Sequence, residues 1–317
     1  MQLVLHHYDG SPFGEKVATL LGYKGVAWRS VRIPPVLPRP LLAPLTGVYR
    51  RTPVLQVGRH VYCDTRCILA FLEREFPAPT LFPRGSRLAS DLMTFWAEPR
   101  VFVAMAPLRF RSVEDVEGVF AGAVDAARFS ADRAPFMQGA LDVTRVAELA
   151  PAAWDQVRVF LNVLDRALEP DGPYLAADRP SVADFAAYPL VWWLDHRPRV
   201  DRLIDERPRV RAWLDQMYAI GHGQVSAMDA KEALEELRLC PATELPPARS
   251  DAALAADPFG RGPGQRVRVA ADDYGRDAVV GRLVSATPDE IVLAREHPEV
   301  GLLFQHFPRI GFEILPA

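Results

Sequence analysis

Apolar positions in the first 80 residues switch between short runs and the spacing of a helix. Residues 3–8 form one run, and residues 52–63 form two more around a turn at Gly58, which predicts a buried strand and a hairpin. From 64 to 76 the apolar residues recur at three and four positions, as on one face of a helix. The pattern predicts an α/β unit over residues 1–80.

The middle of the chain has helical spacing throughout. Residues 150–168 place apolar side chains every three or four positions, and another helix is expected to begin at Ser181 and extend past Trp193. Prolines and a glycine are concentrated in the segment before residue 86, and further prolines interrupt the helices that follow. We therefore expect an all-helical domain over residues 86–240.

The last part of the chain changes pattern again. Residues 241–263 are rich in proline, alanine, aspartate and glycine, which is typical of a linker. Residues 264–317 alternate apolar and polar positions between turn signals, which predicts a small antiparallel sheet or barrel. The five expected strands are 265–270, 279–285, 290–294, 301–307 and 311–315. The polar and aromatic segment 306–309 could contact the substrate pocket or a partner, or it could pack against the helical domain, which we expect. The pattern assigns no function to this module.

Composition narrows the class of protein. With 317 residues and 49% apolar content, the chain can bury a large core in two or three domains. Its net charge of −3 gives no basic excess, which disfavours nucleic acid as a partner. No apolar run approaches the ~20 residues that cross a bilayer, and the N-terminus lacks a signal-peptide pattern. We expect a cytoplasmic protein without a membrane partner.

Cysteine and histidine usage disfavours metal and redox chemistry. Cys63, Cys67 and Cys240 lack the spacing of metal ligands, and none of the seven histidines forms a helix-spaced pair. Three cysteines in a chain of this length suit a reducing compartment. We expect no metal, and the cysteines are expected to be small buried side chains.

Ser11 and Pro12 stand where a helix is expected to follow the first strand. Proline suits the first helical turn, and serine is a common cap there. The free N–H groups and the dipole of a helix start also favour an anion, and a serine hydroxyl can donate to a thiolate. Ser11 is therefore either a cap alone or a cap that also activates a thiol.

Pro53 and Asp64 flank the predicted hairpin. Proline inside a central strand would remove a ladder hydrogen bond. A cis Thr52–Pro53 bond at the start of the strand would resolve this and turn the backbone of Thr52 toward an extended peptide ligand, whereas a trans proline would imply an edge strand. Asp64 and Thr65 are expected to cap the following helix, whose start could also receive a γ-glutamyl carboxylate.

Taken together, these segments resemble the glutathione S-transferase superfamily, as a serine- or cysteine-type, bacterial-like member. The resemblance rests on Ser11-Pro12-Phe13 after the first strand, Thr52-Pro53-Val54-Leu55 and the pair Asp64-Thr65. It is extended by residues 180–187, where Ser181 and Asp184 form a variant of the capping box in the family's helical domain. It covers about residues 1–240 and implies a thioredoxin-like domain, an all-α domain and, beyond the family, the small β module.

The resemblance also implies roles for individual residues. Ser11 matches the catalytic position, Thr52 the residue whose backbone pairs with the cysteinyl moiety of glutathione, and Pro53 the cis-proline. The remaining residues that the resemblance places at glutathione are Phe13, Arg50, Arg51, Asp64 and Thr65. Among these, Arg51 stands where many members have a lysine near the glycyl carboxylate, and Arg50 could share that task.

Three features depart from the family pattern or stay open. The acidic pair is Asp-Thr rather than Glu-Ser, and residues 34–40 are rich in proline where many members have a short helix. Tyr8 lies near the position of the catalytic tyrosine in tyrosine-type members, so it is the alternative to Ser11. Candidates for the pocket of a second substrate are Phe102, Met105, Arg109 and Phe110, for which a place in the core is an equal alternative.

The resemblance implies a homodimeric transferase that activates the thiol of glutathione, as co-substrate, for attack on an electrophilic small molecule. A reductase of this fold needs cysteine where Ser11 stands, often with another at the position of Gly14. A glutathione-dependent isomerase and a non-catalytic binding or scaffold protein remain as alternatives. Product mass separates the first from a transferase, and failure to bind glutathione would favour the second.

Overall fold

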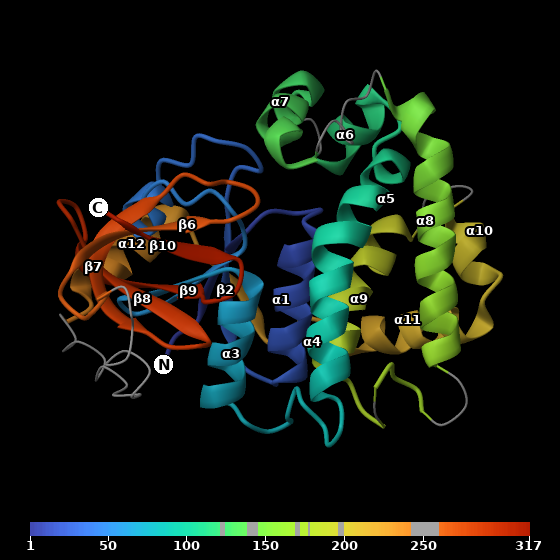
Figure 1. Ribbon diagram of the computed structural model, residues 1–317, viewed down its shortest axis with the longest axis horizontal. Coiled ribbons are helices and arrows are strands. Elements are labelled where there is room, and N and C mark those ends of the chain that lie inside the picture. The colour runs from blue at the N-terminus through green and yellow to red at the C-terminus, as the bar shows by residue number, and fades with distance from the viewer. Residues whose placement is uncertain (121–123, 138–144, 169–171, 177, 196–199, 242–259) are drawn as a thin grey trace. The chain divides into compact units, whose positions relative to one another are not determined.

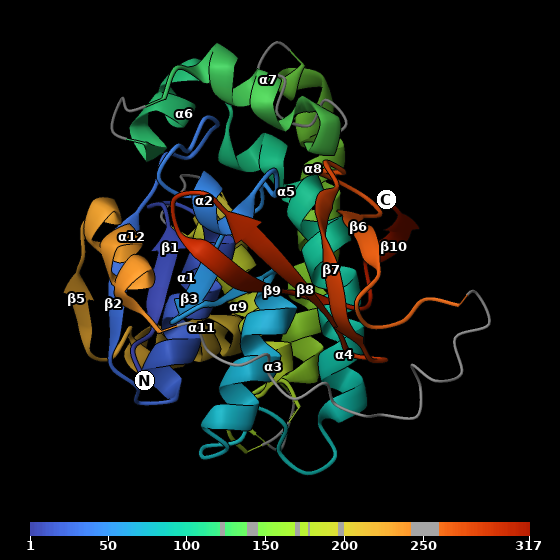
Figure 2. The same cartoon turned by 90° about the vertical axis from the view of Figure 1, so that its left-hand side faces the viewer.

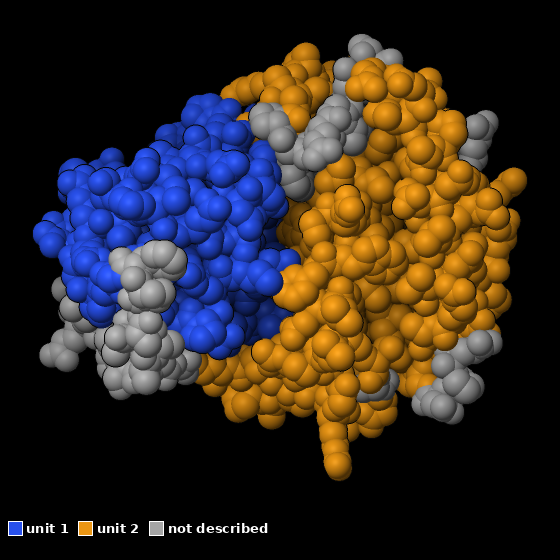
Figure 3. Space-filling model, in the orientation of Figure 1, with its two compact units in different colours: residues 1–8, 27–71, 224–317 blue, residues 9–26, 72–223 orange. Residues whose placement is uncertain are grey.

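The computed structural model describes residues 1–120, 124–137, 145–168, 172–176, 178–195, 200–241 and 260–317. The chain divides into two compact units, which Figure 3 shows in different colours. Unit 1 contains residues 1–8, 27–71 and 224–317, and unit 2 contains residues 9–26 and 72–223. Most of the predicted linker 241–263 lies outside the described residues.

Unit 1 is built on a sheet of ten strands in the order β10-β6-β7-β8-β9-β4-β3-β1-β2-β5. Figure 2 shows β5, β2, β1 and β3 toward one side of this sheet and β9, β8, β7, β6 and β10 toward the other. The strands are β1 (Val4–His7), β2 (Trp28–Arg32), β3 (Val54–Val57), β4 (His60–Cys63), β5 (Val225–Ala227), β6 (Arg266–Ala271), β7 (Val279–Ala286), β8 (Glu290–His297), β9 (Gly301–Pro308) and β10 (Phe312–Pro316). The predicted hairpin and all five predicted strands of the C-terminal module are therefore confirmed. Two helices, α2 (Ala43–Thr46) and α12 (Ala230–Leu239), belong wholly to this unit.

The C-terminal strands do not form a sheet of their own. Strand β9 pairs in parallel with β4, with His60 opposite Phe304 and Tyr62 opposite His306. The segment 306–309 begins inside this pairing, and the ring of His306 stacks on that of Tyr62 at 4.3 Å. Its packing against the helical domain stays a prediction. The sequence expectation of a separate small sheet is corrected, because β6–β10 extend the sheet that contains β1–β4.

Buried polar side chains hold the two parts of the sheet together. Arg59, in the β3–β4 turn, donates from Nη1 to the carbonyls of Val300 (2.8 Å) and Leu302 (2.9 Å). Gln305 on β9 is fully buried and donates to the carbonyl of Thr46 at 3.1 Å. Because buried backbone carbonyls need partners, these side chains fix how the segments meet.

One hydrophobic cluster spans both parts of unit 1. It includes Val54 and Val61 from the hairpin and Leu283, Leu293 and Phe307 from the C-terminal strands. Side chains of β3, β4, β7, β8 and β9 therefore share this single core. The C-terminal module is thus part of the core of unit 1.

Unit 2 is helical (Figure 1). Its helices are α1 (Pro12–Tyr23), α4 (Arg87–Trp96), the π-helix η1 (Ala97–Val101), α5 (Phe102–Arg109), α6 (Val113–Val119), α7 (Ala126–Met137), α8 (Val146–Ala167), α9 (Val182–Leu194), α10 (Val200–Asp205) and α11 (Pro208–Ile220). Helix α3 (Thr65–Glu75) begins in unit 1 and ends in unit 2. The expected fold class, a thioredoxin-like part and a helical part followed by C-terminal strands, is confirmed.

The predicted capping box at the start of α9 is present. Asp184 accepts from the backbone N–H of Ser181 at 2.8 Å and from Nε1 of Trp213 at 2.9 Å. Burial raises the pKa of Asp184, and these donors oppose that rise. The buried side chain of Lys16 on α1 pairs with Glu98, so unit 2 also contains an ion pair in its core.

Candidate functional site

Ser11 caps helix α1 in unit 2. Its backbone is extended (φ −79°, ψ 117°), and its Oγ accepts from the N–H of Gly14 at 3.1 Å. Pro12 occupies the first turn, where its missing N–H costs no hydrogen bond. The capping role is confirmed. Because Oγ uses an acceptor position for the cap, its proton remains available in principle for donation to an anion.

Thr52, Pro53 and Arg51 precede strand β3 in unit 1. The Thr52–Pro53 peptide bond is cis, as the sequence predicted. Pro53 is buried, while Thr52 and Arg51 are half-buried. The proline precedes the first residue of the strand, Val54, so it takes no place in the ladder between β3 and its neighbours.

Asp64 lies between β4 and α3 in the left-handed region, with φ 81°. Its Oδ1 accepts from the N–H of Arg66 at 3.0 Å, and its carbonyl accepts from the N–H of Ile68 at 3.1 Å. Thr65, the first residue of α3, is buried. The predicted cap is confirmed for Asp64, and its Oδ2 lies 3.9 Å from Nη1 of Arg51.

Arg51 contacts the loop between β6 and β7, at Asp273 and Tyr274. Its Nε donates to the carbonyl of Tyr274 at 2.9 Å, and its Nη2 contacts Asp273 and the same carbonyl. The guanidinium of Arg50 lies 5.3 Å from the centroid of the Tyr274 ring. Asp273 lies more than 220 residues from Arg51 in the chain, and no local sequence pattern predicts this contact.

The predicted site residues fall into two sets. Unit 1 contains Tyr8, which is half-buried after β1, together with Arg50, Arg51, Thr52, Pro53, Asp64 and Thr65. Unit 2 contains Ser11, Phe13, Phe102, Met105, Arg109 and Phe110. Within unit 1 the structure brings Arg51 and Asp64 together, and within unit 2 it brings Phe13 and Phe102 together, with ring centroids 5.0 Å apart.

The candidates for a second-substrate pocket lie on or just after α5. Phe102, Met105 and Phe110 are buried, and the rings of Phe102 and Phe110 lie 5.0 and 5.4 Å from that of Trp193. These contacts fit the core alternative. Arg109 differs, because its Nε and Nη1 are buried and find no hydrogen-bond partner within the described structure.

Burial disfavours ionisation of the Cys63 and Cys67 thiols to thiolates. Burial raises the pKa of Cys63 to about 12, and it also raises the pKa of Cys67 well above its usual value. Since the thiolate is the reactive form, neither side chain is suited to disulfide exchange at neutral pH. Within the described ranges, no three histidine, cysteine or acidic side chains gather in a way that could hold a metal ion.

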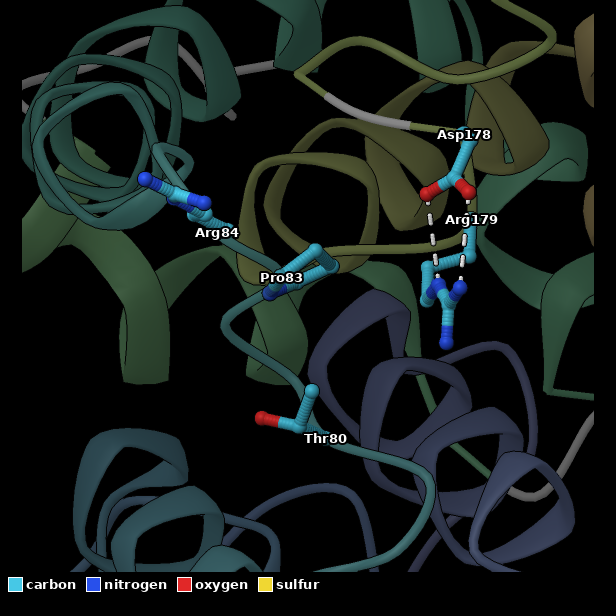
Figure 4. A pocket seen from close by; sticks show the side chains of 5 residues that line it. All are labelled: Thr80, Pro83, Arg84, Asp178 and Arg179. Carbon is cyan, nitrogen blue, oxygen red and sulfur yellow. Dashed lines mark hydrogen bonds and ion pairs between the residues drawn. The ribbon is translucent and has the colours of Figure 1, made fainter.

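Two pockets lie away from these residues. One, of about 390 Å³ in unit 2, is lined by Thr80, Pro83, Arg84, Asp178 and Arg179, and Figure 4 shows Asp178 and Arg179 hydrogen-bonded to each other along its edge. The other, of about 560 Å³ in unit 1, lies between the start of the chain and the end of α12, with Gln2, Gln56 and Glu236 among its lining residues. Neither contains a predicted site residue. No helix in the described segments has the length and apolar character needed to cross a membrane.

Comparisons with known proteins cover both units. Residues 5–80 match the N-terminal domain of glutathione S-transferases, and residues 146–216 match their C-terminal domain. A GST-like protein from Pseudomonas syringae is 32% identical, with 100% of this chain and 99% of that chain aligned and a TM-score of 0.78. Among proteins with curated descriptions, none matches this chain.

More distant structures share the fold. A glutathione S-transferase from Rhodospirillum rubrum F11 is 18% identical over 78% of this chain and 95% of its own, with a TM-score of 0.52. The beta-etherase LigF from Sphingobium sp. strain SYK-6 is 18% identical over 69% and 96%, with a TM-score of 0.53. With both domain matches and full-length similarity to the Pseudomonas protein, the chain belongs to the glutathione S-transferase superfamily.

Proposed function

We propose that this protein is a glutathione transferase that activates the thiol of glutathione for attack on an electrophilic small molecule. The observation that carries the proposal is the arrangement of Thr52, Pro53 and Asp64 in unit 1. A cis-proline before β3 and an acidic cap at the start of α3 are what the family resemblance leads us to expect at a glutathione site. The family match and the glutathione transferases among its structural relatives support the same activity.

Each residue has a distinct task in this proposal. The backbone of Thr52 pairs with the cysteinyl part of glutathione, while Asp64, Thr65 and the N–H groups at the start of α3 receive its γ-glutamyl end. Arg50 and Arg51 supply positive charge near the glycyl end. Phe13 takes part in binding through its position next to Ser11 in the first turn of α1.

Ser11 acts on the sulfur. A thiol such as that of glutathione titrates near ~8.5, so stabilising the thiolate raises the population of nucleophile at neutral pH. The Ser11 hydroxyl donates to the sulfur while its oxygen continues to cap α1. The thiol gives up its proton to water, and the thiolate attacks the electrophilic carbon. As the carbon–sulfur bond forms, the bond from that carbon to its leaving group breaks and the group departs with the electron pair, which leaves glutathione attached to the product. Tyr8 is the alternative donor.

The surroundings of this reaction belong to the same proposal. The electrophile binds against residues of α5 and its C-terminal end, which include Phe102, Met105, Arg109 and Phe110. The working form is a homodimer in the cytoplasm. The domain boundaries 1–80, 86–240 and 264–317 stay a prediction.

Calorimetry with reduced glutathione tests the binding step. Wild type is expected to bind, and Asp64→Asn, which keeps the shape of the cap but removes its charge, should weaken binding about tenfold to hundredfold. Asp289→Asn makes the same change at an exposed turn and should bind like wild type. If wild type releases no heat with millimolar glutathione, the scaffold alternative replaces this proposal.

Product mass tests the reaction step. Incubation with glutathione and a panel of electrophiles should yield adducts that carry the mass of glutathione. If an isomerised product forms while free glutathione is recovered unchanged, the activity is that of an isomerase and the transferase proposal is wrong.

A further inference from the structure

An aromatic cluster in unit 2 connects the start of α1 with the end of α5. The ring of Phe13, two residues after Ser11, lies 5.0 Å from that of Phe102 on α5. The ring of Phe102 lies 5.0 Å from that of Trp193 on α9, which in turn lies 5.4 Å from the ring of Phe110. The proposed thiol activator and the C-terminal end of α5 are therefore joined by one continuous series of ring contacts.

Two polar side chains at this cluster have buried donors without a partner. Trp193 is 4% exposed, and its Nε1 finds no hydrogen-bond acceptor among the described residues. Arg109, which precedes Phe110, has two such donors, Nε and Nη1. Since buried donors in folded proteins are nearly always paired, the two side chains together indicate a ligand that supplies the acceptors.

Arg109 also carries a charge that no described residue balances. Its guanidinium makes no hydrogen bond or ion pair within the described segments, and it lies 5.7 Å from the ring of Phe110. Asp115 in the following helix has another partner, because it accepts from the backbone N–H of Arg111 at 2.9 Å. An unpaired guanidinium presents a planar fork of donors that matches a carboxylate.

Arg211 shows how a structural arginine of the same unit is paired. It is half-buried like Arg109, but its Nη2 lies 2.8 Å from Asp195 and 3.0 Å from Asp205. Placing a guanidinium partly out of water is costly unless such partners are present. Arg109 has no such partners among the described residues, so an external anion is the group that would complete its surroundings.

We infer that the electrophile of this protein is an aromatic carboxylate, and that Arg109 is the residue that selects for its acidic group. The inference rests on the proposed function, because it assumes that a thiolate forms beside Ser11. The carboxylate accepts from the guanidinium of Arg109, and Nε1 of Trp193 donates to a second acceptor on the ligand, such as a nitro or carbonyl oxygen. The reactive carbon then lies toward Phe13.

The length of α5 suits a ligand with one aromatic ring. Phe102 and Arg109 are the first and last residues of this helix, so their backbones are ~10 Å apart along its axis. Side chains on a helix lean toward its N-terminus, which brings the guanidinium back toward Phe102. A benzoate with a leaving group opposite its carboxylate is expected to span the distance that remains.

Two matched electrophiles test the inference on the full chain. With 4-chloro-3-nitrobenzoate and its methyl ester, the thiolate attacks the carbon that carries chlorine and chloride departs, but only the first has a carboxylate. In Arg109→Gln the ratio of kcat/KM for the acid to that for the ester should fall about tenfold to hundredfold, mainly through KM, since a charge-assisted hydrogen bond is lost. Arg109→Lys keeps the charge without the fork and should lie between. Arg111→Gln, at an exposed arginine, should keep the wild-type ratio.

Thermal unfolding gives a readout that does not depend on conjugation. 3-Nitrobenzoate lacks the leaving group, and its binding to the folded protein should raise the Tm of wild type but not that of Arg109→Gln. Because Arg109 makes no hydrogen bond to a described residue, the substitution itself should not lower the Tm of the free protein. A lower Tm in the free variant, with the same ligand-induced rise as in wild type, would show that Arg109 supports the fold and not a ligand.

The outcomes separate this inference from the function on which it rests. If wild type conjugates only the ester, or if Arg109→Gln leaves the ratio unchanged, the inference is wrong although the proposed function stands. If wild type conjugates neither compound and 3-nitrobenzoate does not raise its Tm, the inference is wrong, and the panel of electrophiles decides the proposed function separately. If the acid binds through Arg109 but no electrophile of the panel is conjugated, the carboxylate site stands and the proposed function fails.

Discussion

The two parts of the sheet in unit 1 differ in what they contribute. Strands β1–β4 are four or five residues long, and the segments around them hold the cis bond before Pro53 and the left-handed Asp64. Strands β6–β10 are five to eight residues long; β6 to β9 pair as antiparallel neighbours joined by turns, and β10 pairs in antiparallel fashion with β6. The candidate chemistry therefore lies in the irregular segments around the short strands, as expected for functional residues carried on a regular scaffold.

The longer strands nevertheless reach the candidate site. Arg59 and Gln305 connect the two parts through buried hydrogen bonds, and Asp273 contacts Arg51 from the loop after β6. A region that resembles an appendage in the sequence is thus both a support for the hairpin and a neighbour of Arg51, one of the candidate site residues. Variants in each part can test whether the two parts of the sheet differ in this way.

The largest effect is expected at Ser11, which follows the short strand β1 in the chain. Ser11→Ala removes the hydroxyl that the proposed mechanism aims at the sulfur, so kcat/KM for conjugation should fall roughly 10²–10⁴-fold. Ser285→Ala makes the same change within β7 and should leave kcat/KM unchanged. An unchanged rate in Ser11→Ala, combined with a loss in Tyr8→Phe, would transfer the catalytic role to Tyr8.

Loss of the cap accompanies this change and has to be measured separately. Replacing a serine cap by alanine costs about 1 kcal/mol of stability. Urea unfolding of Ser11→Ala should therefore show a small decrease in the free energy of unfolding. The apparent pKa in the pH profile of kcat should rise only if the hydroxyl stabilises the thiolate.

The second effect tests whether the long strands belong to the same core. Phe307 is fully buried on β9 and belongs to the cluster that also contains Val54 and Val61 of the hairpin. Phe307→Ala should cost about 3–5 kcal/mol, because a large cavity forms where an aromatic ring was packed. Hydrogen exchange should show lost protection in β3 and β4 as well as in β8 and β9. Ile310→Ala, at a residue that is 51% exposed, should change little. Loss of protection confined to β6–β10 would mean that the C-terminal strands unfold independently.

Local features of the fold could be predicted from sequence, and pairings between distant segments could not. The caps at Ser11 and Asp64, the cis bond before Pro53 and the five C-terminal strands each follow from a few neighbouring residues. The pairing of β4 with β9 does not, because an alternating pattern determines which face of a strand is buried and not which strand lies beside it.

One signal could have indicated that pairing. Strand β4 would form an edge if the sheet ended there, yet Val61, Tyr62 and Cys63 are apolar on both faces of the strand. Edge strands usually carry charged residues or prolines, or are covered by a helix or a loop.

The contact of Asp273 with Arg51 had no comparable signal, since an aspartate in a turn is ordinary in any exposed loop. For the pocket candidates, helical spacing does not separate a core position such as Met105 from one that lines a cavity.

The third effect concerns a buried histidine of the short strands. Burial lowers the pKa of His6 from its usual 6.5 to about 4, although its hydrogen bond to Gln56 opposes the shift. The unfolded chain therefore binds a proton between pH 6.5 and 4 that the folded protein excludes. The contribution of His6 to the free energy of unfolding is fully present above pH 6.5 and is lost as the pH falls to about 4. The loss amounts to about 3 kcal/mol.

His6→Gln keeps a polar partner for Gln56 and removes the titration. Its free energy of unfolding should depend less steeply on pH between 6.5 and 4 than that of wild type, as measured by urea unfolding at a series of pH values. His297→Gln, on the long strand β8, should retain the wild-type slope. Equal slopes in wild type and His6→Gln would show that His6 takes up a proton in the folded protein.

The smallest effect is expected for Gln305, a polar side chain between the two parts of the sheet. It donates to the carbonyl of Thr46 at 3.1 Å and accepts from Nε of Arg295 at 2.9 Å, within a fully buried environment. Gln305→Leu has a similar size but leaves these groups without partners, so it should cost about 1–3 kcal/mol. Gln265→Leu removes hydrogen bonds to the exposed loop at Gly260 and Gly262 and should cost only a few tenths of a kcal/mol, because water replaces them. Equal losses in the two variants, measured by urea unfolding, would mean that the buried junction adds no more stability than an exposed turn.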